Sequence, residues 1–170
     1  SAWWWAVTVS VLVVTADDRV VGYLAANVRT VRYLLLQPAI LLFSMLPKAI
    51  ARLAAGRYSV STRRFIFWFI TRSYAETPAF PRLSPHFHVN ILPGWRRADV
   101  TRDLIFGFLR DLERRGIDRV FVQIQTFGSR RKDATFLRFG FRLYDRRRQT
   151  RFDHVGVRRE VYVSTFVREC

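Results

Sequence analysis

Three polar side chains alternate along one segment that has the composition of a β-strand. His86, His88 and Asn90 occupy every second position of His86–Leu92, and alternate residues of a strand lie on one face of its sheet. An imidazole titrates near neutral pH, so His88 could take a proton from an amine that approaches this face. The alternative is a set of polar residues on an accessible strand face. A metal site would need a third strong ligand, and nothing places His154 nearby, so no metal is expected.

A basic loop follows this strand. The segment GWRRADVTRDLIFGFLRDLERRG, from Gly94 to Gly116, leads from that loop into an amphipathic helix. The unpaired N–H groups and the dipole of a helix N-terminus favour an anion, so a phosphate could bind on the first turn. Phosphate loops of this shape usually carry glycines where this segment has Asp99 and Thr101. Both residue types are also good N-caps, so the loop is expected either to hold a phosphate or to act as an ordinary helix cap.

The spacing of apolar residues predicts the elements that position these groups. A helix is expected over Thr101–Arg115 because Leu104, Ile105, Phe108, Leu109 and Leu112 share one face. Gly116 is a natural residue to follow its C-terminus, and a buried strand is expected at Arg119–Gln125. Strand, loop, helix and strand then form a βαβ unit with the candidate phosphate loop at its first turn.

The rest of the chain predicts further strands and one helical insertion. A hairpin is expected from two strands, Val7–Thr15 and Val20–Asn27, joined by a turn at 16–19. Further strands are expected at Phe65–Ile70, Phe141–Tyr144 and Glu160–Val167. Pro38 and Pro47 break Tyr33–Ala55 into short helical pieces. This segment, part of an insertion at about 31–57, either packs on the domain or lies flat on a membrane through its apolar and basic residues.

The composition favours anionic partners. The chain has 170 residues, a formal net charge of +16 and a pI of about 11.5, and nearly all of its positive charge is arginine. Arginine suits bidentate contacts with phosphate or carboxylate, so nucleic acid, acidic lipid or a phosphorylated cofactor would fit. A bias in the coding genome is the alternative. The single cysteine, Cys170, excludes an internal disulfide framework and fits a cytoplasmic or other reducing compartment.

From His86 to Phe141 the sequence resembles the GCN5-related N-acetyltransferase (GNAT) superfamily. The residues that carry this resemblance are HFHVNILPGWRR, the helix ending RRGI, the strand RVFVQI, and FLRFGF, with RVVGYLAA at Arg19–Ala26 as an earlier strand. Together they cover roughly two thirds of the chain. The family usually has a strand and two helices before the hairpin, whereas little precedes Val7 here, so that part is expected to be missing or replaced.

The resemblance implies acyl transfer from acetyl-CoA to an amine, between two neighbouring parallel strands that splay apart. The pantetheine arm is expected beside Asn90–Leu92 and the pyrophosphate on the loop amides of Arg96–Thr101. A backbone N–H near Ile91–Leu92 would stabilise the oxyanion of the tetrahedral intermediate. The predicted cofactor-binding residues are Asn90, Ile91, Leu92, Arg96, Arg97, Ala98, Asp99, Val100, Thr101, Arg102, Ser129 and Phe136.

Two features depart from the family pattern. Asp99 and Thr101 stand at glycine positions of the loop, where the carboxylate of Asp99 would repel a pyrophosphate that three neighbouring arginines would attract. Many family members also place a tyrosine, as general acid, four residues before the glycine of Gly-Phe. That position is Phe136, which has no proton to give. Tyr144 on the following strand is the nearest substitute for the acid, and Ser129 is another.

These observations predict one domain, residues 1–170, with an α/β fold: a GNAT-like mixed sheet flanked by helices. The leading function is N-acetyl transfer from acetyl-CoA to a small-molecule or protein amine. The alternatives are an inactive, acetyltransferase-like subunit of an RNA-containing assembly such as a ribosome, and a peripheral membrane module that uses residues 33–55. The basic stretch Tyr144–His154 binds RNA or an acidic acceptor, or is a solvated loop. The acceptor, the acyl chain, the oligomeric state and the presence of upstream residues stay open.

Overall fold

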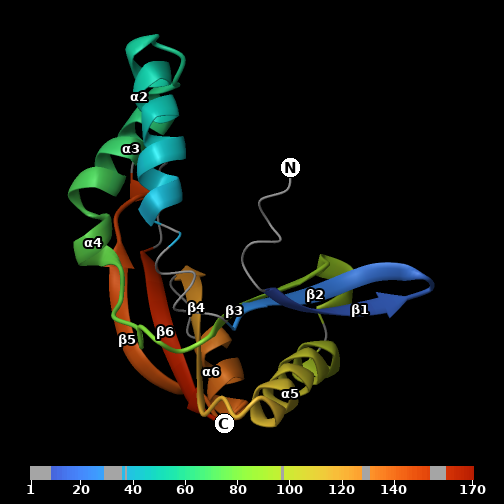
Figure 1. Cartoon of the computed structure of the whole chain (residues 1–170). Helices are drawn as coiled ribbons and strands as arrows, with labels where there is room; N and C mark the ends of the chain where they lie inside the picture. The colour runs from blue at the N-terminus through green and yellow to red at the C-terminus, as the bar shows by residue number, and fades with distance from the viewer. Residues whose placement is uncertain (1–8, 29–35, 37, 97, 128–130, 154–159) are drawn as a thin grey trace.

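The computed structural model describes residues 9–28, 36, 38–96, 98–127, 131–153 and 160–170, and its centre is a mixed sheet (Figure 1). The sheet order is β1-β2-β3-β4-β6-β5, and every neighbouring pair is antiparallel except β3 and β4, which run parallel. The strands are β1 (Val9–Ala16), β2 (Arg19–Asn27), β3 (His86–Ile91), β4 (Arg119–Phe127), β5 (Arg142–Gln149) and β6 (Val161–Glu169). This arrangement confirms the predicted α/β fold with a mixed sheet.

The hairpin of β1 and β2 forms as its sequence predicts. Asp17 and Asp18 both adopt positive φ angles, 49° and 58°, which suits a tight turn between twisted antiparallel strands. On β2, Gly22 lies opposite Ile91 of β3, and a Cβ at this glycine would stand 3.0 Å from Ile91 Cγ1. A side chain at position 22 would therefore require Ile91 and the neighbouring backbone of β3 to shift by a few tenths of an ångström.

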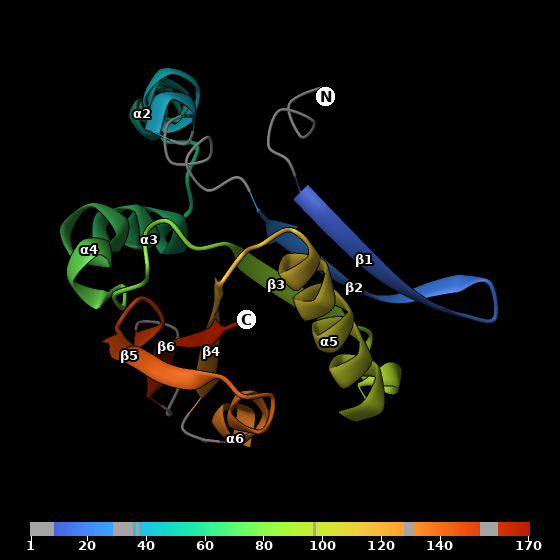
Figure 2. The ribbon, with the colours of Figure 1, turned by 60° about the horizontal axis from the view of Figure 1, so that its bottom comes forward.

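Helices α5 (Ala98–Arg114) and α6 (Arg131–Arg138) cover one face of the sheet, as Figure 2 shows. All five apolar residues that predicted α5 are buried, and α5 begins three residues earlier than expected. Aromatic rings join the layers: Phe87 of β3 lies 5.4 Å from Phe108 of α5 and 5.9 Å from Phe141 between centroids. Phe136 of α6 stacks on Phe166 of β6 at 5.8 Å. These contacts fix both helices relative to the strands.

A helical insertion connects β2 to β3 and extends beyond the end of the sheet (Figure 1). It comprises the π-helical turn η2 (Leu41–Met45), α2 (Leu46–Ala54), α3 (Val60–Thr71) and α4 (Ser73–Glu76). The insertion is therefore longer than the predicted 31–57, and the strand predicted at Phe65–Ile70 is wrong, because this run lies inside α3. Ser59 caps α3, since its Oγ accepts a hydrogen bond from the Thr62 N–H at 3.2 Å.

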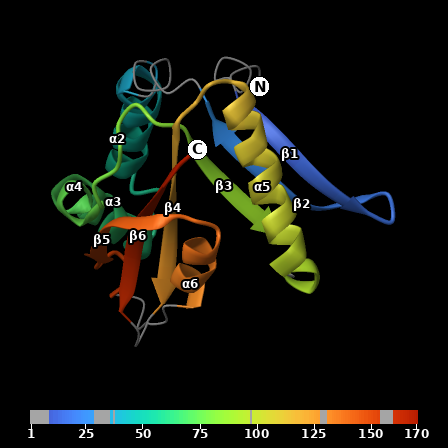
Figure 3. The ribbon, with the colours of Figure 1, turned by 90° about the horizontal axis from the view of Figure 1, so that it is seen from below.

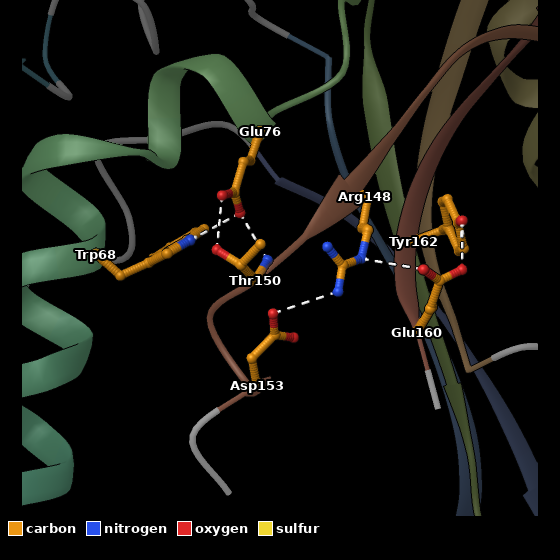
Figure 4. Close-up of polar contacts among 7 residues, drawn as sticks. All are labelled: Trp68, Glu76, Arg148, Thr150, Asp153, Glu160 and Tyr162. Carbon is orange, nitrogen blue, oxygen red and sulfur yellow. Dashed lines mark hydrogen bonds and ion pairs between the residues drawn. The ribbon is translucent and has the colours of Figure 1, made fainter. Parts of the chain in front are cut away.

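One carboxylate holds the insertion against the sheet (Figure 4). Glu76 Oε2 accepts hydrogen bonds from Trp68 Nε1 at 2.8 Å and from the Thr150 N–H at 2.7 Å, and Thr150 Oγ1 donates to Oε1 at 2.7 Å. Burial alone would raise the pKa of Glu76. The hydrogen bonds from Thr150 and Trp68, with the charge of Arg72, outweigh that effect and leave the pKa lowered. Trp68 is the one buried residue of α3, so this contact fixes the inner face of the helix.

We expect Glu76→Ala to lower the free energy of unfolding by about 2 kcal/mol, because three hydrogen bonds to a charged group are lost together. Tryptic cleavage at Arg72 and Arg82 should also become faster. Glu160→Ala is the matched control: its carboxylate also contacts an arginine and a hydroxyl, Arg148 at 3.4 Å and Tyr162 at 2.7 Å, but on an exposed surface (Figure 4). Urea denaturation should show a much smaller loss for that variant. Equal losses would contradict the assignment of Glu76 as the anchor.

Candidate functional site

The parallel strands β3 and β4 separate almost as soon as they meet. Their register contains a single pair, His86 with Phe121, and the Phe121 N–H donates to the Pro85 carbonyl oxygen at 3.0 Å. Figure 3 shows the two strands diverging from that end. The predicted splay is therefore confirmed. We call the space that opens there the β3–β4 cleft; its volume is about 450 Å³, and it is lined by Val89, Asn90, Ile91, Arg96, Thr101, Ile124, Gln125, Thr135 and Phe136.

The backbone of β3 directs polar groups into this cleft. The Leu92 N–H donates to the Val21 carbonyl oxygen at 2.9 Å, so it belongs to the β2–β3 ladder. Because hydrogen-bonded and non-hydrogen-bonded pairs alternate in an antiparallel ladder, the N–H and C=O groups of Ile91 and Val89 point the other way, toward β4. The oxyanion donor predicted at Ile91–Leu92 can therefore only be the Ile91 amide, since the Leu92 amide is engaged in the sheet.

A cation and a helix N-terminus lie together at the cleft. Arg96 follows the short turn η3 (Pro93–Trp95), and its Nε donates to the Ile91 carbonyl oxygen at 2.9 Å. This bond holds the guanidinium beside the end of β3. Helix α5 begins two residues later and contributes Thr101 to the cleft lining. An arginine, first-turn amides and the positive end of a helix dipole form a suitable environment for a phosphate group.

The carboxylate of Asp99 partly occupies this anion site. Its Oδ1 accepts a hydrogen bond from the Val100 N–H at 3.0 Å, so a first-turn amide is already capped by a carboxylate. The exposed guanidinium of Arg102 pairs with Asp103 at 3.2 Å. Neither Arg102 nor Leu92 lines the cleft. Arg97 lies outside the described residues, as does the side chain of Ala98.

The residues considered for the general acid do not meet at the cleft. Phe136 lines the cleft from α6, so the position expected for a tyrosine faces the site with a phenyl ring. Tyr144 is on β5, which β6 separates from β4, and its side chain is 52% exposed. The structure therefore does not bring Tyr144 to the cleft, and we do not assign it the role of the acid. Ser129 lies outside the described residues.

His86, His88 and Asn90 share one face of β3, as predicted, and this face is opposite Phe87 and Ile91. The two imidazole rings are in edge contact at 5.6 Å, and His86 also lies 5.5 Å from the Phe121 ring. Burial lowers the pKa of His86, and the nearby charge of His88 lowers it further. His88 is exposed and lies outside the cleft lining, so only an acceptor that approaches from this face would meet it.

Four residues that line the cleft were not predicted from the sequence: Val89, Ile124, Gln125 and Thr135. Their types are ordinary for strand and helix interiors, and what brings them to the site is the separation of the strands. Adjacent residues such as Ile124 and Gln125 both reach the cleft because it opens at the edge of β4. Among the described residues, no three His, Cys, Asp or Glu side chains form a group that could hold a metal ion.

Solved structures show what this fold is similar to, although no protein-family profile and no curated protein matches the sequence. A ribosomal-protein-alanine N-acetyltransferase from Brucella melitensis has 14% identity and a TM-score of 0.54, over 95% of this chain and 69% of that one. An agmatine N-acetyltransferase in its apo form has 18% identity and a TM-score of 0.55, over 94% and 74%. A GNAT family acetyltransferase from Elizabethkingia anophelis with acetyl-CoA bound has 7% identity and a TM-score of 0.53, over 95% and 76%. The chain has the GNAT fold.

We expect the stability of the protein to fall through His86 as the pH drops from neutral into the mildly acidic range. Above the ordinary histidine pKa of about 6.5, the residue is neutral in both folded and unfolded chains and contributes no pH dependence. As the pH falls, the unfolded chain takes up a proton before the folded chain, because the folded pKa is lowered, so unfolding becomes easier. His86→Phe should flatten this slope in thermal unfolding, whereas the control His88→Phe should largely keep it. A slope unchanged by His86→Phe would show that other groups cause it.

Proposed function

We propose that this protein is an acyl-CoA-dependent N-acetyltransferase that acts on an amine. The observation that carries the proposal is the β3–β4 cleft with Arg96 and the N-terminus of α5 beside it. One end of the cleft can hold phosphate, and its length is bordered by strand backbone that points inward. That combination matches a ligand with a pyrophosphate at one end and an amide-containing arm at the other.

The residues present fit acetyl-CoA in two respects. The inward-facing N–H and C=O groups of Val89 can pair with the amides of a pantetheine arm, as an added strand would, whereas the Ile91 carbonyl oxygen already accepts from Arg96. Apolar side chains of Ile124 and Phe136 border the same space and suit the carbon chain between those amides. The altered loop fits less well, because Asp99 carries negative charge and caps the Val100 amide.

When bound, the thioester supplies an activated acyl group, and the protein positions it and manages charge. The Ile91 amide is the donor that we assign to the oxyanion. His88 would accept a proton from an amine that approaches over its face of β3. Attack by a neutral amine on a thioester depends mainly on positioning, so a phenyl ring at position 136 does not argue against transfer.

The acceptor is proposed only as an amine. The names of the structural neighbours include a ribosomal-protein-alanine N-acetyltransferase, an agmatine N-acetyltransferase and a putative phosphinothricin N-acetyltransferase. These names span protein and small-molecule acceptors. A panel of both kinds, with release of free CoA thiol as the readout, is therefore the appropriate assay for turnover.

Calorimetric titration with acetyl-CoA should show saturable one-to-one binding that persists at high salt. Arg96→Ala should weaken this binding about tenfold, because a charge-assisted contact with phosphate is lost. Arg110→Ala is the matched control. Like Arg96→Ala it replaces one arginine and removes one positive charge, but Arg110 is an exposed residue of α5 that does not line the cleft. The acetyl-CoA affinity of this control should change by less than about twofold, because salt screens the interaction between a distant charge and the ligand.

A different result would favour the alternative of an inactive, RNA-associated subunit. Equal weakening by both arginine variants would show that acetyl-CoA binds only through the general positive charge of +16. Binding that disappears with salt and is displaced by RNA would show the same, because counterion release makes such binding strongly salt-dependent.

The double variant Asp99→Gly with Thr101→Gly should bind acetyl-CoA about fivefold more tightly. It removes one carboxylate beside the phosphate site and frees the Val100 amide from its cap. The gain should be largest at low ionic strength and should be absent for pantetheine, which has no pyrophosphate. A gain for both ligands alike would place the effect outside the phosphate site.

A further inference from the structure

The helical insertion exposes an unusual amount of apolar surface. We call η2, α2 and α3 the helical arm, which spans residues 41–71. Phe43 is 83% exposed, Phe67 is 68% exposed and Ile70 is 73% exposed, and others are exposed by more than two fifths: Leu41, Leu42, Met45, Leu46, Ile50, Leu53, Val60, Phe65 and Phe69. Surface patches of this kind mark an interaction site.

Helix α2 has a clear division between its faces. Leu46, Ile50 and Leu53 recur at helical spacing and share one face, and none of them is buried. Lys48 and Arg52 lie on the opposite face. An amphipathic helix usually buries its apolar face against its own domain, and here that face is left to solvent. A basic polar face with an open apolar face is the pattern of a helix that lies in a membrane interface.

Helix α3 presents its other side in the same way. Its inner face is fixed through buried Trp68, which donates to Glu76. Phe67 and Ile70 lie away from that contact and are exposed, Arg63 falls beside both at helical spacing, and the exposed Arg64 lies one turn before Phe67. The Glu76 anchor therefore holds this apolar and basic face in a fixed direction, away from the sheet.

The charge of the region selects the partner. The sequence contains no acidic residue between Asp18 and Glu76, while the arm and its flanks carry Lys48, Arg52, Arg57, Arg63, Arg64 and Arg72. Helix α5, by contrast, pairs arginines with aspartates, as Arg114 does with Asp111 at 3.5 Å. A surface that is basic and apolar at once complements anionic headgroups above acyl chains. A symmetric contact between two copies of the arm would instead bring like charges together.

We propose that the helical arm docks this protein on an anionic lipid bilayer. Phe43, Phe67 and Ile70 enter the acyl boundary while the arginines and the lysine contact lipid phosphates. The proposed attachment uses one face of the arm; in the described part of the chain no helix is long and apolar enough to cross a membrane. No residue of the arm lines the β3–β4 cleft, so the docking proposal and the proposed transfer rest on different residues.

The test is flotation with lipid vesicles of phosphatidylcholine alone or with about 30% phosphatidylglycerol, a mixture whose anionic fraction is set to attract basic surfaces. The protein should float with the mixed vesicles and much less with the neutral ones. Phe67→Asp with Ile70→Asp should abolish flotation even at low salt. The control Leu137→Asp with Leu143→Asp changes two residues of similar class, 54% and 48% exposed, by the same total charge and should retain it.

The basic residues are tested in the same assay. Arg63→Gln with Arg64→Gln should weaken vesicle binding roughly tenfold, whereas Arg110→Gln with Arg138→Gln, exposed residues on α5 and α6, should have little effect. Equal effects of the two charge pairs, or of the two aspartate pairs, would overturn the proposal, because the net charge alone would then explain binding. No flotation at all would also overturn it.

Two further measurements separate this proposal from its alternatives. Light scattering that shows a dimer, dissociated by Phe67→Asp with Ile70→Asp, in a protein that does not float would assign the arm to self-association instead. RNA binding that the same variant abolishes, again without flotation, would assign it to RNA. Acetyl-CoA affinity should be unchanged in every arm variant, so failure of the docking proposal leaves the proposed transferase function intact.

Discussion

The single paired position between β3 and β4 is the constraint on which the rest of the structure depends. On one side β3 is fixed to β2 along its whole length, and on the other β4 is fixed to β6 along its whole length. The two half-sheets meet only at His86 and Phe121. Beyond this pair, the inward-facing backbone groups of Val89 and Ile91 have no strand to bond with; the Ile91 carbonyl oxygen accepts from Arg96 instead, and the other buried polar groups require partners of their own. The cleft is therefore a site for water or for a ligand that carries amides.

The half-sheets are joined by an aromatic core on the side of α5 and α6, in which Phe141 lies 5.9 Å from Phe87 and 5.7 Å from Phe136 between ring centroids. Phe87 belongs to one half-sheet and Phe166 to the other, while Phe108 and Phe136 contact them from the two helices. The same helices contribute Thr101 and Phe136 to the cleft. Core packing and site geometry thus share residues, and a change of volume at Phe136 would alter both.

The sequence predicted those parts of the molecule whose signals are local. Helix α5, the β1–β2 hairpin and the strand with His86, His88 and Asn90 depend on periodicity and turn chemistry within a few residues. Phe65–Ile70 was wrongly expected as a strand because its aromatic and β-branched residues favour extended structure, whereas the cap at Ser59 and the docking of Trp68 select a helix. Tyr144 follows α6 closely in sequence, but β6 separates its strand from the cleft, and strand order leaves no local signal.

The arm is not needed to complete the sheet. Strand β2 precedes the insertion and β3 follows it, and the two strands pair directly from Gly22 with Ile91 to Asn27 with His86. The inner face of the arm is tied down through the hydrogen bond from Trp68 to Glu76. Burial explains Trp68 but not Phe43, Phe67 or Ile70, which contribute nothing to the core and expose apolar area to water. Covering them with another apolar phase would remove this cost, and the absence of acidic residues from the helical arm, residues 41–71, is why we propose that this phase carries negative charge at its surface.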